Sequence, residues 1–489
     1  MGDNNKVLNY LHDIIYRKIH RLIKILDIQI TSNLNEAGIE TRPAKTNGLW
    51  CCALLPAILL MNIFQYNVSP VHKLIIYVSV GQFFYCLLFI LFMSVSCLIL
   101  QEQIYGGCIA SSLCSALLVY LFISQDLTLS LISTVPSICL FSLLLRYSLT
   151  KFPKTFTIGE AMIVTQSIVL FGLATIVQVI AHDPRDEINF VNAIVFTILT
   201  TVALIVTALY MLKEKHRNLS TLAYIVGFAI VFTLLVLHFL LGASCMLRIL
   251  NYVFMDHNRI NLLSFWLFLV LIAALVVVLR TSLAVKASTV TRKSFHILAS
   301  CVFLSGILYD VEFMRLAAGG GLGLLVLVEA LRKSRIEPIS SALQSAFNVY
   351  SDEKDVGSFA MTPMYLYAGL ACPLVLVPVY KGSELELLSG VLSIGVGDTA
   401  ASWFGSRYGF NTWPDSSRTM EGTTFNILSQ VITVYVLQMF DLVRAKHGLV
   451  RASIAALVSG LVEAQTGQVD NLILPLVSLL SFQATCFLR

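Results

Sequence analysis

Charged residues are scarce in this sequence. Only 12% of its 489 residues are Asp, Glu, Lys or Arg, whereas soluble proteins have about 25%. Hydrophobic residues make up 57%, and the mean hydropathy is +0.82. The net charge of +5 is small and spread over several connections, so it does not indicate a nucleic-acid partner. The composition excludes an ordinary soluble protein and predicts an all-α polytopic membrane protein.

Paired cysteine motifs are absent from the sequence. Most of the eleven cysteines lie inside apolar runs, and none forms a C-x-x-C pair. This pattern indicates neither a disulfide framework nor a zinc site. We also expect no cleavable signal peptide, because residues 1–48 are polar and contain a basic group at Arg17, Lys18, Arg21 and Lys24.

Apolar runs of membrane-spanning length recur along the rest of the chain. They lie near 49–66, 73–99, 107–125, 127–145, 158–181, 188–212, 221–242, 260–280, 294–309, 312–331, 360–380, 386–405, 422–440, 448–462 and 471–488. The sequence therefore predicts about 13–15 transmembrane helices. Residues 1–48 are predicted to form a cytosolic tail with an amphipathic helix over roughly Val7–Ile28. We divide the remainder into an N-terminal transmembrane half, 49–280, and a C-terminal transmembrane catalytic half, 281–489.

The polar motifs of the second half fall in alternate connections, so they are predicted to share one face of the membrane. These connections are Arg280–Lys293, Arg332–Ser358, Ser406–Glu421 and Glu463–Asp470. The same count places the basic connections 146–154 and 213–217 on that face, which is therefore predicted to be cytosolic. Arg444, Lys446 and Arg451 fall on the opposite side and count against this orientation.

The most informative stretch is Leu392–Thr424, where a single acid, Asp398, lies within an apolar helix. A carboxylate inside a membrane span is costly and indicates a functional site that faces the protein interior. Small residues recur at intervals of four along this helix, at Ser393, Gly397, Ala401 and Gly405. Such a stripe lets another helix approach closely. The polar loop that follows leads into a new helix start, where free N–H groups suit phosphate; an ordinary capped helix is the structural alternative.

Three other motifs are candidates on the same face. RKSFH contains Lys293 and His296, although interfacial anchoring would also explain its cations. SDEKDVG contains Asp355, although a solvated acidic loop would also explain it. EAQTGQVDN contains Asp470, and helix capping is its alternative.

Taken with these motifs, the pattern GVGDTAAS…FG…G…WP…RTMEGT resembles the C-terminal signature of dolichol kinases, which phosphorylate dolichol with CTP. The resemblance covers roughly Thr291–Pro475. Phytol kinases and CDP-diacylglycerol synthases carry weaker variants of its GD…G…EG pattern. The resemblance implies a phosphotransferase that moves the γ-phosphoryl group of CTP to the terminal hydroxyl of dolichol or another polyprenol. The products would be CDP and dolichyl phosphate, which supports protein glycosylation.

The resemblance also implies a set of site residues. The expected catalytic residues are Asp398, Asp355, Lys293, His296 and Glu421. The expected metal is Mg²⁺ or another divalent cation, with Asp398, Glu421 and Asp470 as ligands; which carboxylate acts as base and which binds metal stays open. The expected CTP segment comprises Ser406, Arg407, Tyr408, Gly409, Phe410, Asn411, Thr412, Trp413, Pro414, Asp415, Ser416, Ser417, Arg418, Thr419, Met420 and Glu421.

The chain departs from the family pattern at two positions. Family members commonly have two lysines before the Thr of the TxEGT motif, where this chain has Ser417-Arg418. One cation is therefore missing, and charge balance would depend on Arg407, Lys293 or the metal. Where members often have Thr-His, this chain has Thr362-Pro363, so no role for that histidine is carried over.

Two other functions stay open on the residues alone. A cytidylyltransferase that makes a CDP-lipid would release pyrophosphate instead of CDP. A multi-span transporter would also use an intramembrane Asp398, but no inverted repeat relates the two halves. The dolichol kinase resemblance implies a multi-pass protein of the endoplasmic reticulum membrane whose active site faces the cytosol. Its expected partners are the polyprenol, CTP and the lipid bilayer, with no nucleic acid.

Overall fold

The computed structural model describes residues 21–102, 105–124, 126–180, 187–282, 289–351, 354–378, 382–414 and 416–488. Within these ranges the regular structure is helical, and one isolated antiparallel bridge joins Thr412 to Thr419. Residues 21–36 are helical. Most of the predicted amphipathic helix over Val7–Ile28 lies outside the described residues.

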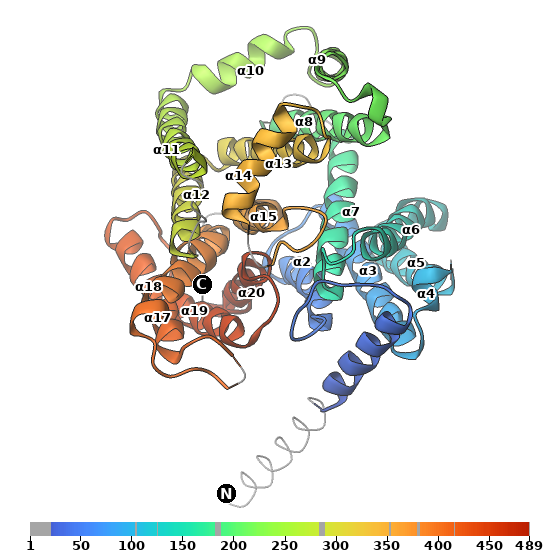
Figure 1. Cartoon of the computed structure of the whole chain (residues 1–489), viewed down its shortest axis with the longest axis vertical. Helices are drawn as coiled ribbons and strands as arrows, with labels where there is room; N and C mark the ends of the chain where they lie inside the picture. Colours follow the sequence, from blue (N-terminus) through green and yellow to red (C-terminus); the bar gives the residue numbers. More distant parts are fainter. Residues whose placement is uncertain are drawn as a thin grey trace, which may run out of the picture. The chain divides into compact units, whose positions relative to one another are not determined.

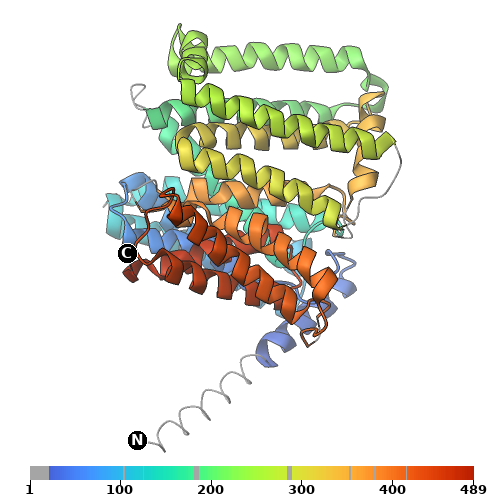
Figure 2. The same cartoon turned by 90° about the vertical axis from the view of Figure 1, so that its left-hand side faces the viewer.

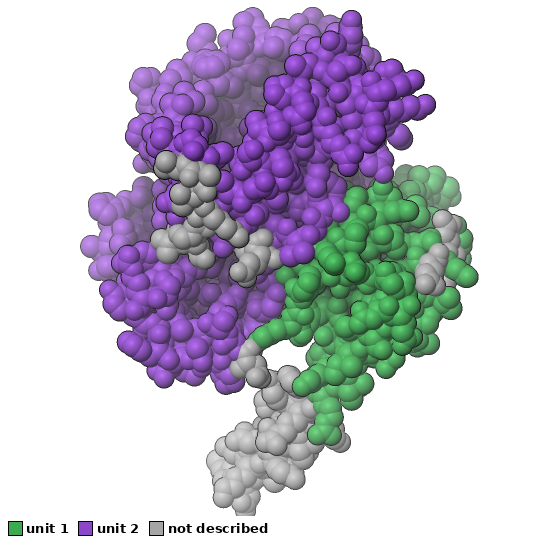
Figure 3. Space-filling view, in the orientation of Figure 1, with its two compact units in different colours: residues 1–56, 72–170 green, residues 57–71, 171–489 purple. Residues whose placement is uncertain are grey.

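The chain forms two compact units, coloured separately in Figure 3. Unit 1 comprises Met1–Pro56 and His72–Leu170, and unit 2 comprises Ala57–Val71 and Phe171–Arg489. The predicted halves divide at residue 280, whereas the contacts place 171–280 with the C-terminal segments. The reason is that α8 (Glu187–Met211) packs directly on α13 (Val311–Lys333).

Unit 1 is built mainly from helices in the first 170 residues. They are η1 (Leu49–Ala53), the start of α2 (Leu54–Gln65), most of α3 (Pro70–Val95), α4 (Leu98–Gln101), α5 (Gly106–Val119), η2 (Tyr120–Ser124), α6 (Leu127–Lys151) and the start of α7 (Ile158–Ile180). Asp126 begins α6, because its carboxylate accepts hydrogen bonds from the backbone N–H groups of Thr128 and Leu129. A buried ion pair between Arg42 and Glu160 (2.5 Å) fixes the segment before η1 to α7.

Unit 2 contains the helices that follow (Figure 1). After α8 they are η3 (Glu214–His216), α9 (Leu219–Leu241), α10 (Cys245–Phe254), α11 (His257–Ser282), α12 (Thr289–Tyr309), α13, α14 (Ile339–Tyr350), α15 (Met361–Leu376), α16 (Glu384–Leu387), η4 (Val391–Asp398), α17 (Thr399–Tyr408), α18 (Met420–Met439), α19 (Gly448–Gln465), α20 (Asp470–Ala484) and η5 (Cys486–Leu488). The short helices α10 and α14 lie in connections for which the sequence predicts no helix. Figure 2 shows the long helices α11, α12 and α18 running in broadly the same direction.

Nine helices in the described part of the chain are long and apolar enough to cross a membrane. They are α3, α5 with η2, α6, α7, α8, α9, α11, α13 and α19. Shorter apolar helices lie at Leu49–Gln65, Cys245–Phe254, Met361–Leu376 and Asp470–Ala484. The prediction of an all-α, multi-span membrane protein is confirmed.

The helical segment that contains Asp398 lies at the centre of the C-terminal helices. Its first part, η4, is a π-helix and packs against α12, α15, α17, α18, α19 and α20. The predicted small-residue stripe faces α18: a Cβ on Gly397 would meet the side chains of Asn426 and Gln430. A Cβ on Gly405 would lie 3.3 Å from the Cα of Gly422. The stripe therefore permits the close approach that brings Asp398 and the α18 N-terminus together.

Candidate active site

A cavity of about 550 Å³ lies in unit 2 where five separate segments meet. These segments are the start of α12, the connection between α14 and α15, the η4–α17 segment, the loop between α17 and α18, and the connection between α19 and α20. Residues from all four connections that the sequence places on one face line this cavity.

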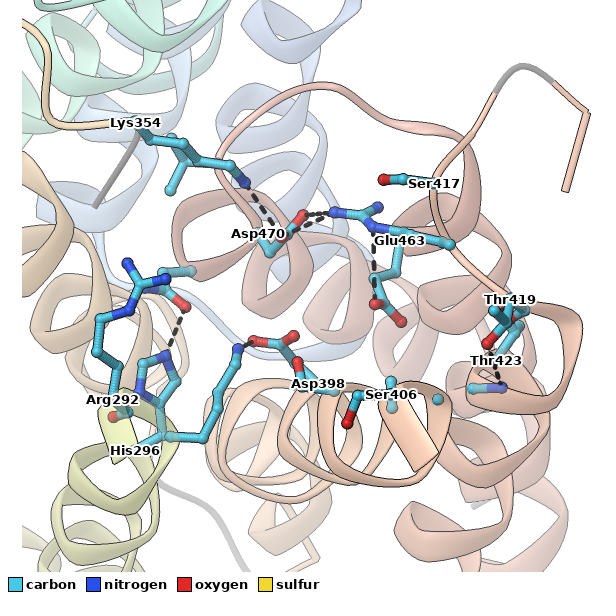
Figure 4. Close-up of a pocket in the computed structure, with 18 of the residues that line it drawn as sticks. Arg292, His296, Lys354, Asp398, Ser406, Ser417, Thr419, Thr423, Glu463 and Asp470 are labelled. Atoms are coloured by element: carbon cyan, nitrogen blue, oxygen red, sulfur yellow. Dashed lines mark hydrogen bonds and ion pairs between the residues drawn. The ribbon is translucent and has the colours of Figure 1, made fainter. Parts of the chain in front are cut away.

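Three carboxylates from different helices surround this cavity (Figure 4). Asp398 ends η4, Glu463 lies in the last turn of α19, and Asp470 begins α20. Each of them is paired with at least one cation in the arrangement that the structure shows. The cavity is therefore a cluster of alternating charges.

Asp398 pairs with Lys293. The Lys293 ammonium group donates a hydrogen bond to Oδ2 of Asp398, and the two side chains are only 14% and 4% exposed. Packing of α12 against η4 brings together these two residues, which are 105 positions apart. A carboxylate this buried needs a compensating cation, and Lys293 provides it. The two predicted catalytic residues thus form one unit.

Asp470 lies between two cations. Nη2 of Arg418 donates to both carboxylate oxygens (2.7 and 2.8 Å), and Nζ of Lys354 lies 3.2 Å from Oδ2. Arg418 also donates to the Thr466 carbonyl (3.3 Å), and its Nε lies 3.9 Å from Oε1 of Glu463. Burial by itself lowers the pKa of the Arg418 guanidinium, but the carboxylates of Asp470 and Glu463 outweigh burial and raise that pKa above its ordinary value.

A buried hydrogen-bond network lies beneath Glu463. Nδ2 of Asn426 donates to Oε2 of Glu463 (2.5 Å). Nε2 of Gln430 donates to Oδ1 of Asn426 (2.6 Å) and to Oγ of Ser459 (3.3 Å). These contacts lock Glu463 in place below Arg418, so α18 and α19 together set the position of the guanidinium.

His296 lies about two turns into α12 on the cavity wall. Its Nε2 lies 3.2 Å from Oδ1 of Asn471, and its Nδ1 lies 3.3 Å from the Arg292 carbonyl. An amide oxygen can only accept, so in the arrangement that the structure shows Nε2 carries a proton and donates it to Oδ1 of Asn471. Asn471 then orients the imidazole toward the cavity.

The loop between α17 and α18 folds back on itself. The backbone N–H of Trp413 donates to the Arg418 carbonyl (2.9 Å), and the backbone N–H of Met420 donates to the Asn411 carbonyl (2.7 Å). The hydroxyl of Thr419 caps α18 by accepting from the Gly422 N–H (3.1 Å). This turn points Arg418 at the cavity.

Only part of the predicted CTP segment lines the cavity. Ser406, Ser417, Arg418 and Thr419 do so. Arg407 instead lies over the Trp403 ring, 4.2 Å from its centroid, and Trp413 donates from its indole to Thr423 (3.0 Å). The remaining described members lie outside the lining: Tyr408, Gly409, Phe410, Asn411, Thr412, Trp413, Pro414, Ser416, Met420 and Glu421. Asp415 lies outside the described residues.

Glu421 faces the loop. Its carboxylate accepts hydrogen bonds from the N–H groups of Phe410 and Asn411 (3.2 Å each) and from the Asn411 side chain (2.8 Å). The hydrogen bond from its own backbone N–H, followed by those from Asn411 and Phe410, lowers the pKa of the Glu421 carboxyl. The structure thus brings Asp398 and Asp470 to one cavity and leaves Glu421, the third predicted metal ligand, outside its lining.

Asp355 also lies outside the lining. Its Oδ1 accepts from the Thr362 N–H (2.9 Å) in the first turn of α15, which is the position of a helix-capping group. Its neighbour Lys354 lines the cavity instead. A single lysine in an acidic stretch gives no signal in the sequence, whereas the resemblance of this stretch to the family's D-x-x-D-x-G pattern favoured Asp355.

Several lining residues fall outside the predicted sets: Arg292, Lys354, Thr362, Ala401, Ser402, Gly405, Gly422, Thr423, Glu463, Val469 and Asn471. The network of Asn426 and Gln430 was also missed. The sequence does contain a signal for this network. Two carboxamides four residues apart in an apolar helix share one face and require buried partners.

Comparison with known proteins identifies the family. The family model described as dolichol kinase matches residues 77–372, which is more than half of the chain. The chain belongs to the dolichol kinase family. The matched residues include Lys293, His296 and Lys354 and end before Asp398.

Individual dolichol kinases match over most of this family member's length. The protein of that name from Mus musculus is 29% identical over 400 residues, covering 77% of this chain and 74% of the relative. The Homo sapiens dolichol kinase is 29% identical over 402 residues and covers the same shares of the two chains. The Saccharomyces cerevisiae dolichol kinase is 25% identical over 285 residues, covering 57% of this chain and 53% of the relative. No solved structure matches the chain.

Two carboxylates of the cavity could hold a divalent cation. In the described part of the chain no group of three or more His, Cys, Asp and Glu side chains is arranged to hold a metal by itself. Mg²⁺ commonly binds through one or two carboxylates together with substrate phosphates and waters. Asp398 and Asp470 supply such a pair of carboxylates on one cavity.

Proposed function

We propose that this protein is a dolichol kinase that transfers the γ-phosphoryl group of CTP to the terminal hydroxyl of dolichol. The products are dolichyl phosphate and CDP. The observation that carries the proposal is the convergence of four cations, Arg292, Lys293, Lys354 and Arg418, on one cavity of a multi-span member of this family. Phosphoryl transfer depends mainly on positioning and on neutralising phosphate charge, and these cations suit both tasks.

The residues divide the work between donor and acceptor. Arg418 and Ser417 reach the cavity from the loop at the start of α18, where they can bind nucleotide phosphates. Lys293 and His296 lie on the opposing helix α12, where the acceptor hydroxyl can be oriented. Asp398 and Asp470 would hold Mg²⁺, which would supply further neutralisation of the phosphate charge. CTP as the donor nucleotide follows from the resemblance of the loop.

The position of Asp398 suits a lipid alcohol. Apolar residues precede it in η4, and a polar loop begins about ten residues after it. A polyprenol chain can therefore stay in the bilayer while its hydroxyl meets a soluble nucleotide at the end of the helix. The count of spans places the basic residues Lys213, Lys215, Arg217 and Arg335 on the same face as the cavity, and these residues favour the cytosolic side. We place the protein in the endoplasmic reticulum membrane by its resemblance to the family.

Identification of the nucleotide product tests this proposal. Purified full-length protein is incubated with CTP, Mg²⁺ and dolichol, and the nucleotides are separated. Dolichol-dependent formation of CDP supports a kinase. Formation of pyrophosphate would identify a cytidylyltransferase instead, and no nucleotide turnover with any polyprenol would favour a transporter.

A further inference from the structure

Lys354 and Arg418 approach the same carboxylate from opposite sides of the cavity. Lys354 belongs to the connection between α14 and α15, and Arg418 belongs to the loop between α17 and α18. Figure 4 shows Lys354 and its dashed contact to Asp470 on one side and Glu463 on the other. The Asp470 carboxylate and the two cations form one compact charge cluster. Its atoms are Oδ1 and Oδ2 of Asp470, Nζ of Lys354 and Nη2 of Arg418.

The cluster is open to the cavity. The side chains of Lys354, Arg418 and Asp470 are 32%, 24% and 16% exposed, respectively, and all three line its wall. A phosphate group that enters the cavity can therefore reach both cations. Phosphate and carboxylate oxygens accept hydrogen bonds from the same ammonium and guanidinium donors. The carboxylate of Asp470 thus occupies a place that a phosphate can take.

We propose that Lys354 and Arg418 form a two-sided phosphate clamp that is closed on Asp470 when no nucleotide is bound. We expect the ligand of this clamp to be a nucleoside triphosphate, and this choice of ligand rests on the proposed function. When the polyphosphate enters, both cations exchange the Asp470 carboxylate for phosphate oxygens. Asp470 would then be available as a ligand for a divalent cation bound with the nucleotide.

This clamp provides a second cation beside the one that the loop between α17 and α18 brings. The loop contributes Arg418 to the cavity, while Arg407, in the last turn of α17, lies over the Trp403 ring. Lys354 comes from a different segment and brings a second positive charge to the same carboxylate. Asp470 competes with phosphate in this arrangement, so it lowers phosphate affinity whenever no metal is present to neutralise it.

Binding of inorganic tripolyphosphate tests the clamp without requiring the acceptor lipid. Full-length protein in detergent is titrated with tripolyphosphate in the presence of a chelator, and binding is measured by calorimetry. Lys354→Gln should weaken binding about ten- to hundredfold, since a hydrogen bond to a charged group is lost. Lys354→Arg should restore most of it. The control Lys215→Gln, which removes an exposed lysine of η3 outside the cavity, should leave binding unchanged.

Asp470→Asn gives a test in the opposite direction. It removes the competing charge, so it should tighten metal-free tripolyphosphate binding about tenfold. A purely structural contact between Lys354 and Asp470 predicts no gain from Asp470→Asn and only a lower melting temperature for Lys354→Gln. Unchanged binding by Lys354→Gln, or weaker binding by Asp470→Asn, would overturn the clamp.

The clamp and the proposed function can fail separately. If Lys354→Gln weakens tripolyphosphate binding but the wild-type protein phosphorylates no polyprenol, the clamp stands and the kinase proposal falls. If dolichyl phosphate forms and Lys354→Gln changes neither tripolyphosphate binding nor the KM for CTP, the kinase proposal stands and the clamp falls.

Discussion

At the scale of single residues, Asp398 illustrates what the sequence can reveal. An acid inside an apolar helix needs a partner, and this requirement marked it as a candidate without any structure. Its partner Lys293 was a candidate for another reason, its place in the RKSFH motif. The pairing itself could not be predicted, because it depends on how α12 packs against η4 over a separation of 105 residues.

We expect Asp398→Asn to lower turnover about a hundredfold or more while the protein remains folded, because the charge that faces the cavity is lost. Steady-state kinetics with CTP and dolichol, together with a melting curve in detergent, provide the measurement. Asp441→Asn is the matched control, since Asp441 forms an exposed pair with Arg444 outside the cavity. Normal turnover by Asp398→Asn would remove this residue from the active site.

Glu421→Gln distinguishes a loop-holding role from a metal-binding role. The Glu421 carboxylate accepts three hydrogen bonds from Phe410 and Asn411, and an amide would accept them less well. We therefore expect a higher KM for CTP, by roughly tenfold, and recovery of turnover at saturating CTP. Turnover that stays low at every CTP concentration would instead favour the original expectation that Glu421 binds the metal.

At the scale of helices, the spacing of small residues predicted a close contact, and the structure confirms it between the η4–α17 segment and α18. Spacing along one helix is local information. The network of Asn426, Gln430 and Glu463 joins two helices, so its partners could not be assigned from sequence. Likewise, the amphipathic helices α10 and α14 were too short to give an apolar run of spanning length.

Arg451, one of the three basic residues that opposed the predicted orientation, has a structural explanation. Arg451 is fully buried and donates from Nη2 to Glu386 (2.6 Å) and to the Phe482 carbonyl (3.1 Å). Arg444 pairs with Asp441. The rule for cytoplasmic cations concerns charges in solvent-facing connections, and Arg451 is not one of them. A sequence count cannot separate a buried arginine from an exposed one.

We expect Arg451→Met to destabilise the protein by about 3–5 kcal/mol, because the buried Glu386 carboxylate would lose the guanidinium that is paired with it. The double variant Arg451→Met with Glu386→Met should recover much of the loss, since neither charge is then buried. Denaturation in detergent, followed by helical content, measures both variants. Equal stability of the single variant and the wild type would show that this pair does not hold α16 to α19.

At the scale of the whole molecule, the family assignment and the prediction of many membrane spans came from composition and motifs, both of which are visible in sequence. The division of the chain into compact units is harder to read from the sequence. The polar motifs all lie after residue 280, whereas packing of α8 on α13 joins residues 171–280 to the C-terminal helices. Which side of the membrane the cavity faces is a prediction that labelling can test.

Cysteines introduced at three exposed positions in different connections or helix ends should all react from the cytosolic side of sealed vesicles. Suitable positions are Ser341, Thr412 and Gln465. Lys446→Cys, in the connection between α18 and α19, should react only after the vesicles are opened. These variants are made in a protein whose reactive native cysteines have been replaced. Labelling of Ser341→Cys and Thr412→Cys from opposite sides would contradict the shared cytosolic face.

The central claim, transfer of a phosphoryl group from CTP to a lipid alcohol, is tested most directly by following two labels. Purified protein is given dolichol and CTP labelled at either the γ- or the α-phosphorus, and the lipid is extracted. We predict that the γ label enters the lipid as dolichyl phosphate and that the α label stays in CDP, with both products reduced about a hundredfold or more for Asp398→Asn. Appearance of the α label in the lipid, or of neither label, would contradict this account.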